Sequence, residues 1–181
     1  MRLCEVSEVA YLRYAEGVSE ILIIMKTKNN EIMSYTTSFY HIVLRTYRSG
    51  LTINEEHEKE LYAYILGIAK NLNCKIYRIG GMPDHVHIFV SLPSSLSLAA
   101  FVQRVKTDSS KWLKANPNFP RFRGWGHEYA GFSYSVREKD IIVNYIKRQK
   151  EHHKKKEFVK EYRSFIKDNG VDIDERYFLC D

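Results

Sequence analysis

Hydrophobic and polar residues alternate with a short period in some segments of the chain and with a helical period in others. Residues 38–47 read Ser-Phe-Tyr-His-Ile-Val-Leu-Arg-Thr-Tyr, a run rich in β-branched and aromatic residues that predicts a strand. Asn54 then precedes several acidic residues, as an N-cap does, which predicts a helix. The apolar positions that follow at helical spacing are Leu61, Ile65, Ile68 and Leu72.

A β-hairpin and a second helix are predicted next. Residues 75–79 form the first strand of the hairpin, residues 80–84 its glycine- and proline-containing turn, and residues 85–92 its second strand. The helix after the hairpin has its apolar positions at Leu98, Phe101, Val102, Val105, Trp112 and Leu113.

The rest of the pattern predicts a loop, a strand and a last helix. Residues 116–126 contain two prolines and two glycines, which are typical of a loop. Residues 129–136 follow as a strand. Asp140 is expected to cap a helix that runs from Ile141 to about Glu157 and becomes basic towards its C-terminal end.

This order of elements predicts an α+β protein with a ferredoxin-like split βαβ sandwich. We expect an antiparallel sheet with helices on one face and an extra C-terminal helix that carries Tyr145. Residues 1–32 show no clear period, so they are expected to be an N-terminal extension of uncertain structure or an ordinary strand or helix. Residues 33–181 are expected to form one domain. The fold alone does not indicate an activity.

The composition is typical of a globular protein with an excess of positive charge. Of the 181 residues, 44% are hydrophobic and 28% are charged, which excludes a disordered or fibrous chain. The net charge of +6 suits a polyanionic partner without requiring one. The three cysteines are scattered, and the apolar run at residues 21–25 is too short to span a membrane. A cytoplasmic protein without a membrane partner is expected.

The strongest local signal is the sequence Pro-Asp-His-Val-His at residues 83–87. Residues two apart in a strand point to the same face, so the imidazoles of His85 and His87 project together and suit a divalent ion. Histidine pairs of this kind also occur as ordinary polar faces of strands. Two ligands leave a divalent ion short of partners, so a metal site requires a third group from elsewhere in the chain.

The last predicted helix can supply that group. Tyr145 and Gln149 are four residues apart and therefore lie on one helix face. A tyrosine is a poor nucleophile at its usual pKa near 10, but it could attack a phosphodiester that a bound metal polarises. The alternative is that Tyr145, one of thirteen tyrosines, only packs in the fold.

Together these segments resemble the small single-tyrosine HUH transposases of the insertion sequence 200/605 family. The resemblance rests on residues 35–44, the histidine motif at 83–87, and Tyr145 with Gln149, and it covers nearly everything from Met33 onward. The helical segment 106–113 adds support. The leading 32 residues depart from the family, whose members commonly begin near a position like Met33.

The resemblance implies a role for each residue of the two motifs. His85, His87 and Gln149 would hold Mg or Mn, and Tyr145 would form a 5′-phosphotyrosine intermediate. It further implies cleavage and rejoining of single-stranded DNA at hairpins, and a homodimer in which the tyrosine helix of one subunit serves the histidines of the other. The alternatives are a domesticated relative that processes genomic repeats, a replication-initiation nuclease with the same chemistry, and a non-catalytic nucleic-acid-binding module.

Two further segments could contact DNA. One is a basic stretch whose members are Lys147, Arg148, Lys150, Lys154, Lys155 and Lys156. The other is the aromatic segment 119–129, which could stack unpaired bases or could equally be a packed loop that covers the core. A solvated helix end is the alternative for the basic stretch.

Overall fold

The chain divides by its contacts into two units, residues 1–37 and residues 38–181. The computed structural model describes residues 23–26, 32–153, 158–176 and 178–181. In the first unit, β1 (Ile23–Lys26) pairs antiparallel with β2 (Ile32–Thr36). The domain boundary expected between Ile32 and Met33 falls inside β2, so its position stays a prediction.

A four-stranded antiparallel sheet organises the second unit. Its order is β4-β5-β3-β6, the order of a ferredoxin-like split βαβ plan. The strands are β3 (Phe39–Arg45), β4 (Lys75–Met82), β5 (His85–Ser91) and β6 (Ala130–Tyr134). The predicted α+β class and the antiparallel sheet are therefore confirmed.

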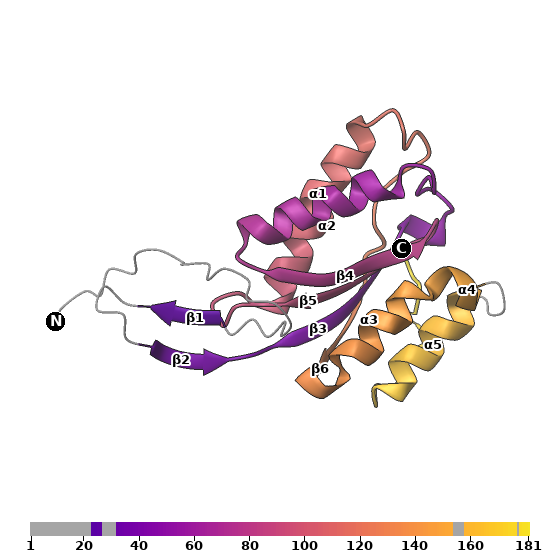
Figure 1. Cartoon of the computed structure of the whole chain (residues 1–181). Coiled ribbons are helices and arrows are strands. Elements are labelled where there is room, and N and C mark those ends of the chain that lie inside the picture. The colour runs from indigo at the N-terminus through magenta and orange to yellow at the C-terminus, as the bar shows by residue number, and fades with distance from the viewer. Residues whose placement is uncertain (1–22, 27–31, 154–157, 177) are drawn as a thin grey trace. The chain divides into compact units, whose positions relative to one another are not determined.

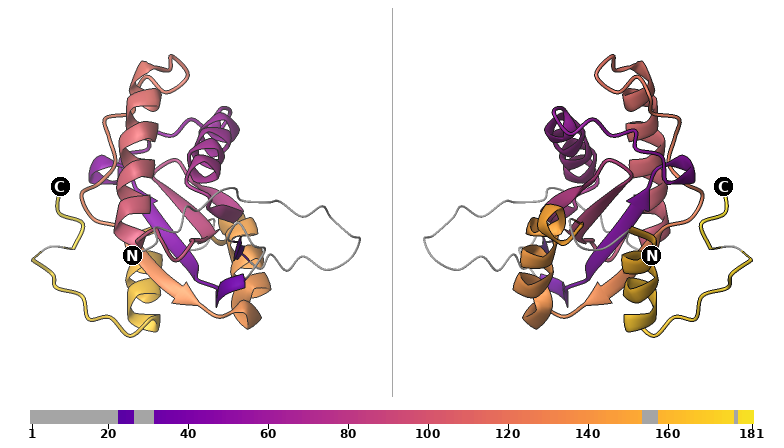
Figure 2. Two further views of the ribbon diagram at one scale, coloured as in Figure 1. Left: turned by 90° about the vertical axis from the view of Figure 1, so that its left-hand side faces the viewer. Right: turned by 90° about the vertical axis from the view of Figure 1, so that its right-hand side faces the viewer.

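Helices cover both faces of this sheet (Figures 1 and 2). On one face lie α1 and α2, and on the other lie α3, α4 and α5. Their bounds are α1 (Glu58–Asn71), α2 (Leu98–Ala115), α3 (Lys139–Lys147), α4 (Gln149–His153) and α5 (Phe158–Asp168). The two helices of the split βαβ unit share one face, as expected, and the additional helices cover the other face. Every residue of β5 is buried, and a strand buried on both sides requires cover on both sides.

The two faces of the sheet pack in different cores. On the first face, alternate strand residues pack against α1 and α2 in the large core, as expected for residues that point away from the histidines. They are Ile42, Leu44, Val86, Ile88 and Val90. On the second face, two smaller clusters join the sheet to α3 and to α5, and polar strand residues lie between them.

Three boundaries differ from the sequence prediction. Asp140 does not cap the tyrosine helix but lies inside it, because α3 begins at Lys139 with Glu138 as its N-cap. The N-cap of α1 is His57 rather than Asn54, because Asn54 forms a turn in which its side chain accepts from the Glu56 backbone. The hairpin turn is shorter than expected because β4 continues through Gly80 and Gly81. A Cβ at Gly81 would lie 2.2 Å from the His85 carbonyl oxygen, so only glycine allows this close pairing.

The last helix of the prediction, from Ile141 to about Glu157, is replaced by α3 and α4, and α5 follows beyond it. Arg148 leaves helical geometry at the end of α3, so Tyr145 and Gln149 belong to consecutive helices. Tyr145 therefore does not lie on the C-terminal helix. The C-terminal helix is α5, which the sequence prediction missed although Phe158, Tyr162 and Phe165 follow a helical period.

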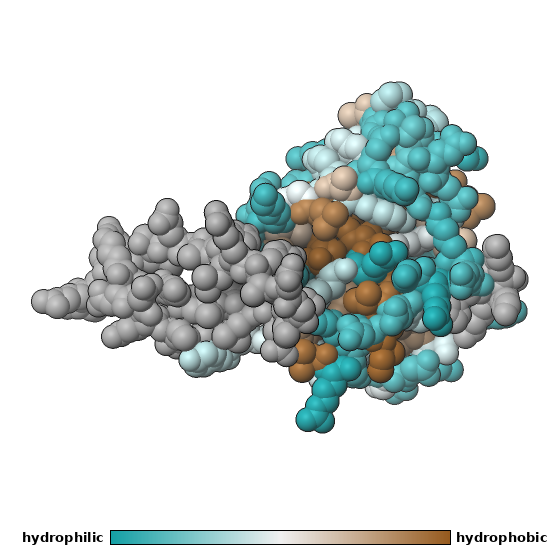
Figure 3. All heavy atoms as spheres, viewed as in Figure 1, coloured by the Kyte–Doolittle hydropathy of each residue, from teal (hydrophilic) through white to brown (hydrophobic). Residues whose placement is uncertain are grey.

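The outer surfaces of the helices are hydrophilic, and hydrophobic side chains appear between them along the sheet (Figure 3). This distribution is typical of amphipathic helices packed on a shared core. Among the residues that the structure describes, no helix is long and apolar enough to cross a membrane.

Candidate active site

The two histidines of the Pro-Asp-His-Val-His motif lie side by side on β5, on the face of the sheet that α3 and α5 cover. Their ring centroids are 5.0 Å apart, and both side chains are buried. Nδ1 of His85 lies 2.6 Å from Oδ1 of Asp84. Since a carboxylate only accepts, a neutral His85 donates from Nδ1 and carries its lone pair on Nε2, the form in which imidazole binds metals.

A third histidine on the neighbouring strand acts on His87 in a similar way. His41 is fully buried on β3, and its Nε2 lies 2.9 Å from Nδ1 of His87. Either ring can donate in this bond. If His87 donates, its lone pair lies on Nε2 as in His85, and the hydrogen of His41 lies on Nδ1. The geometry is thus compatible with the same tautomer in both predicted ligands.

A glycine in β4 lets α3 approach the sheet and brings Tyr145 to the histidines. A Cβ at Gly80 would lie 3.0 Å from both Cγ2 and the carbonyl oxygen of Ile146, so the helix backbone rests directly on the strand. The ring centroid of Tyr145 is then 5.9 Å from that of His87 and 5.8 Å from that of His41. All these residues belong to one chain.

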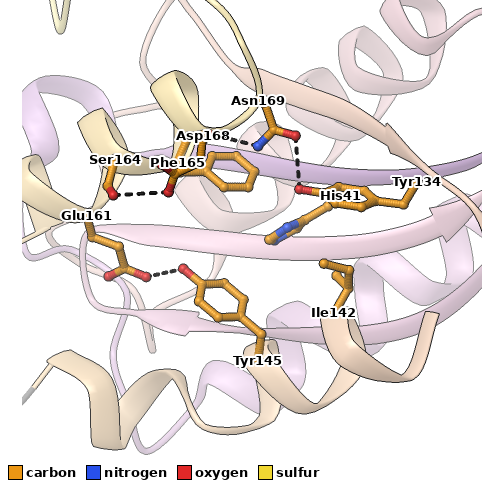
Figure 4. A pocket seen from close by; sticks show the side chains of 9 residues that line it. All are labelled: His41, Tyr134, Ile142, Tyr145, Glu161, Ser164, Phe165, Asp168 and Asn169. Atoms are coloured by element: carbon orange, nitrogen blue, oxygen red, sulfur yellow. Dashed lines mark hydrogen bonds between the residues drawn. The ribbon is translucent and has the colours of Figure 1, made fainter. Parts of the chain in front are cut away.

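Glu161 on α5 joins the tyrosine to the glutamine. The Tyr145 hydroxyl donates a hydrogen bond to Oε1 of Glu161 (Figure 4), and Nε2 of Gln149 donates to the same oxygen over 3.1 Å. Gln149 is buried, and its Oε1 accepts no hydrogen bond within the described ranges. The amide is therefore oriented with its nitrogen towards Glu161 and its oxygen available as a ligand.

Burial and charge change the acid–base properties of this site. Burial lowers the pKa of His41 to about 3, against the opposing charge of Glu161, so His41 is neutral at physiological pH. Burial and the hydrogen bond to Glu161 raise the pKa of Tyr145 above its usual value. The tyrosine is thus a poorer nucleophile in this state than in water.

The segment that carries this geometry matches a protein-family model. The model of IS200-like transposases matches residues 34–149, which is more than half of the chain and includes the histidine pair, Tyr145 and Gln149. The chain belongs to the IS200-like transposase family. This transposase is therefore a DNA-cleaving enzyme by family, as its motifs predict. No curated protein matches it.

Two solved structures resemble the transposase. A protein assigned as a transposase from Deinococcus radiodurans R1 is 21% identical with a TM-score of 0.50, and the match covers 66% of this chain and 95% of that one. A REP-associated tyrosine transposase bound to a REP hairpin is 17% identical with a TM-score of 0.45, over 78% of this chain and 72% of that one. The first likeness supports the fold.

The donor atoms of the transposase fit a divalent ion in part. No group of three or more His, Cys, Asp or Glu side chains is arranged as a metal site in the part of the chain that the structure describes. The predicted set instead combines two imidazoles with the amide oxygen of Gln149, whose lack of a hydrogen-bond partner fits a role as ligand. Three protein ligands leave positions for water or a phosphate oxygen.

The sequence patterns assigned no role to His41, to Glu161 or to Asp84, which holds His85. His41 follows the strand period, so its position on the same face as Val43 could have been predicted, but its neighbour His87 could not. Glu161 could not be placed because α5 itself was not predicted.

The two segments expected to contact DNA have different outcomes. Phe119, Phe122 and Trp125 are buried in the large core, and Trp125 donates to Ser109 over 2.9 Å, so the packed-loop alternative holds for these three. In the basic stretch, Lys150 pairs with Glu58 over 2.7 Å, while Lys147 and Arg148 are exposed. Residues 154–156 lie outside the described residues.

Proposed function

We propose that this transposase cleaves and rejoins single-stranded DNA at hairpin-bearing ends through a 5′-phosphotyrosine on Tyr145. The observation that carries the proposal is the convergence of Tyr145, Gln149 and the histidine pair on one face of the sheet, inside the segment that matches the family. A structural tyrosine has no need of a buried amide and two buried imidazoles beside it.

In the cleavage step, Oη of Tyr145 attacks the phosphorus and the bond from phosphorus to the 3′ oxygen breaks. Glu161 already accepts the hydrogen bond of the Tyr145 hydroxyl, so it is placed to take the proton. The leaving 3′ oxygen takes a proton from water. One phosphoester replaces another, so attack of a 3′-hydroxyl on the phosphotyrosine reverses the step without ATP.

His85, His87 and Gln149 would hold Mg or Mn. When bound, the ion polarises the phosphodiester and offsets its negative charge. The second partners of these ligands keep each donor atom aimed at the site: Asp84 holds His85, His41 holds His87, and Glu161 holds Gln149.

A cavity rich in basic residues lies next to Gln149 and supports a path for the DNA backbone. This cavity, of about 320 Å³, is lined by Gln149, by the basic residues Lys59, Arg78, Lys147 and Lys150, and by Glu58, which pairs with Lys150. Phosphate groups are attracted to such a cluster, and the attraction carries no sequence information. The backbone would thus be guided towards the site by α1, β4 and α4.

The partner state is also a proposal. In the structure the ring centroid of Tyr145 lies 5.9 Å from that of His87 in the same chain. A homodimer with shared sites stays a prediction, and mixing a Tyr145→Phe chain with a His87→Ala chain tests it. Recovered cleavage in the mixture requires sharing between subunits.

The experiment that tests the function incubates the protein with labelled single-stranded hairpin DNA from its own flanks, with Mn and with EDTA. We expect a covalent protein–DNA adduct that requires Mn and disappears in Tyr145→Phe. Tyr64→Phe is the matched control, because Tyr64 stacks on Trp112 at the other face of the sheet. DNA binding without an adduct in the wild type would instead support the non-catalytic binding module.

A further inference from the structure

A cavity of about 360 Å³ lies beside Tyr145, on the histidine face of the sheet. Figure 4 shows that its walls come from four separate elements, since α3 and α5 face each other across strands β3 and β6. The residues that line it include His41, Tyr134, Tyr145, Glu161, Phe165 and Asp168. The proposed mechanism gives this space no role.

The walls combine aromatic faces with hydrogen-bond acceptors. The ring of Phe165 packs edge to face against the imidazole of His41, with ring centroids 4.9 Å apart. The ring centroid of Tyr134 lies 6.2 Å from that of His41. Glu161 and Asp168 add two carboxylates, which are acceptors only when ionised. A flat ligand with N–H donors suits these walls.

A second observation points to a ligand in the same cavity. The side chain of His41 is fully buried, and its Nδ1 has no hydrogen-bond partner among the residues described. A buried polar atom without a partner is costly, so such atoms often mark a place that a ligand fills. His41 lines the cavity, and in the tautomer in which Nδ1 of His87 donates to Nε2 of His41, the hydrogen of His41 lies on Nδ1.

We propose that this cavity binds one nucleobase next to the phosphate that Tyr145 cleaves, and that it prefers a base with an exocyclic amino group. The inference rests on the proposed function. Because the Tyr145 hydroxyl lies at the cavity, a strand whose phosphorus reaches that oxygen brings the neighbouring base to the opening. The base then lies against aromatic rings, as unpaired bases do in other single-strand binding sites.

The polar atoms set the preference. Cytosine and adenine offer an amino group beside a ring nitrogen that accepts, which complements a carboxylate beside the N–H of His41. Thymine reverses this pattern, because it has a carbonyl oxygen in place of the amino group and an N3–H in place of the accepting ring nitrogen. In the same orientation its carbonyl oxygen faces the carboxylate and its N3–H faces the N–H of His41. Asp168 is exposed and lines the cavity, and it accepts a hydrogen bond from Ser164 over 3.1 Å within α5, so it can be changed without disturbing the nucleophile.

The test measures the rate of adduct formation with Mn on oligonucleotides that differ only in the base beside the mapped cleavage position, on its 5′ or its 3′ side. We expect cytosine to react about tenfold faster than thymine at one of the two positions. An abasic nucleotide there should be slower than either. Asp168→Asn should remove most of the preference of cytosine over thymine, while Asp172→Asn, the same charge change on an exposed residue outside the cavity, should retain it.

Equal rates for cytosine, thymine and the abasic nucleotide at both positions would overturn the base site while the adduct itself upholds the proposed function. If the wild type forms no adduct, the proposed function fails, and the base site is tested by binding in EDTA. There, 2-aminopurine placed in turn at each unpaired position beside the hairpin should lose fluorescence on binding at one of them, and Phe165→Leu should reduce that loss. Unchanged fluorescence would overturn the base site as well.

Discussion

The two faces of the central sheet carry opposite kinds of residue although they are built from the same strands. Ile42, Val86 and Ile88 point to the first face and are fully buried among apolar side chains of α1 and α2. His41, His85 and their neighbours point to the second face and are equally buried, but they are polar and hydrogen-bonded. Alternation along a strand thus separates stability from chemistry within a single element.

This separation explains why burial alone does not distinguish a core from a site. Apolar residues gain stability directly from burial, whereas a buried imidazole or amide costs stability unless each polar atom is paired. On the second face, Asp84, Glu161 and the contact between two histidines offset part of that cost. Mutations on the two faces should therefore separate activity from stability.

The largest effect is expected on the second face. Tyr145→Phe should lower covalent adduct formation by at least about 10³-fold, because no other group supplies the nucleophilic oxygen. The free energy of unfolding should change little, since the ring and its packing remain. Adduct formation on gels and chemical denaturation measure the two quantities, and an adduct that persists would assign the nucleophile to another residue.

On the first face, Ile88→Ala should do the reverse. Removing a fully buried side chain from the large core should lower the free energy of unfolding by about 3 kcal/mol. Below the unfolding temperature the rate of adduct formation should stay within about twofold of the wild type. A loss of activity in the folded variant would show that the two faces are coupled.

The dependence of stability on pH tests the second face through the protonation of His41. Its pKa is lowered in the folded protein to about 3, so the unfolded chain binds its proton more readily below pH 6.5. Stability should therefore fall as the pH decreases from 6.5 towards 3, by about 2 kcal/mol at pH 5 from this group alone. His41→Gln should flatten this part of the profile in EDTA, and an unchanged slope would contradict a buried neutral His41.

The smallest effect concerns the contact that connects a strand to the tyrosine helix. Gly80→Ala places a methyl group against Ile146, so α3 must shift and we expect a loss of about 1–2 kcal/mol in stability with about tenfold slower adduct formation. Gly67→Ala is the matched control. Its Cβ meets nothing within 4 Å in the middle of α1, so it should raise stability slightly and leave the rate unchanged.

The sequence alone determined the strands, the class of the fold and the residues of the two motifs. The alternation in 39–45 and 85–91 is local, so it predicts both strands and also places His85 and His87 on one face. The spacing of apolar residues similarly predicts α1 and α2. A family resemblance on these motifs led to the same transposase family that the match over residues 34–149 establishes.

Only the tertiary structure decided which residues contact the two motifs. The break at Arg148 follows from local backbone geometry that an otherwise helical pattern does not reveal, and α5 was missed altogether. Contacts such as Glu161 with Tyr145 and His41 with His87 join residues far apart in the sequence. Periodicity specifies which side of an element is buried, but the partner on that side depends on how the elements pack, and that is a property of the whole fold.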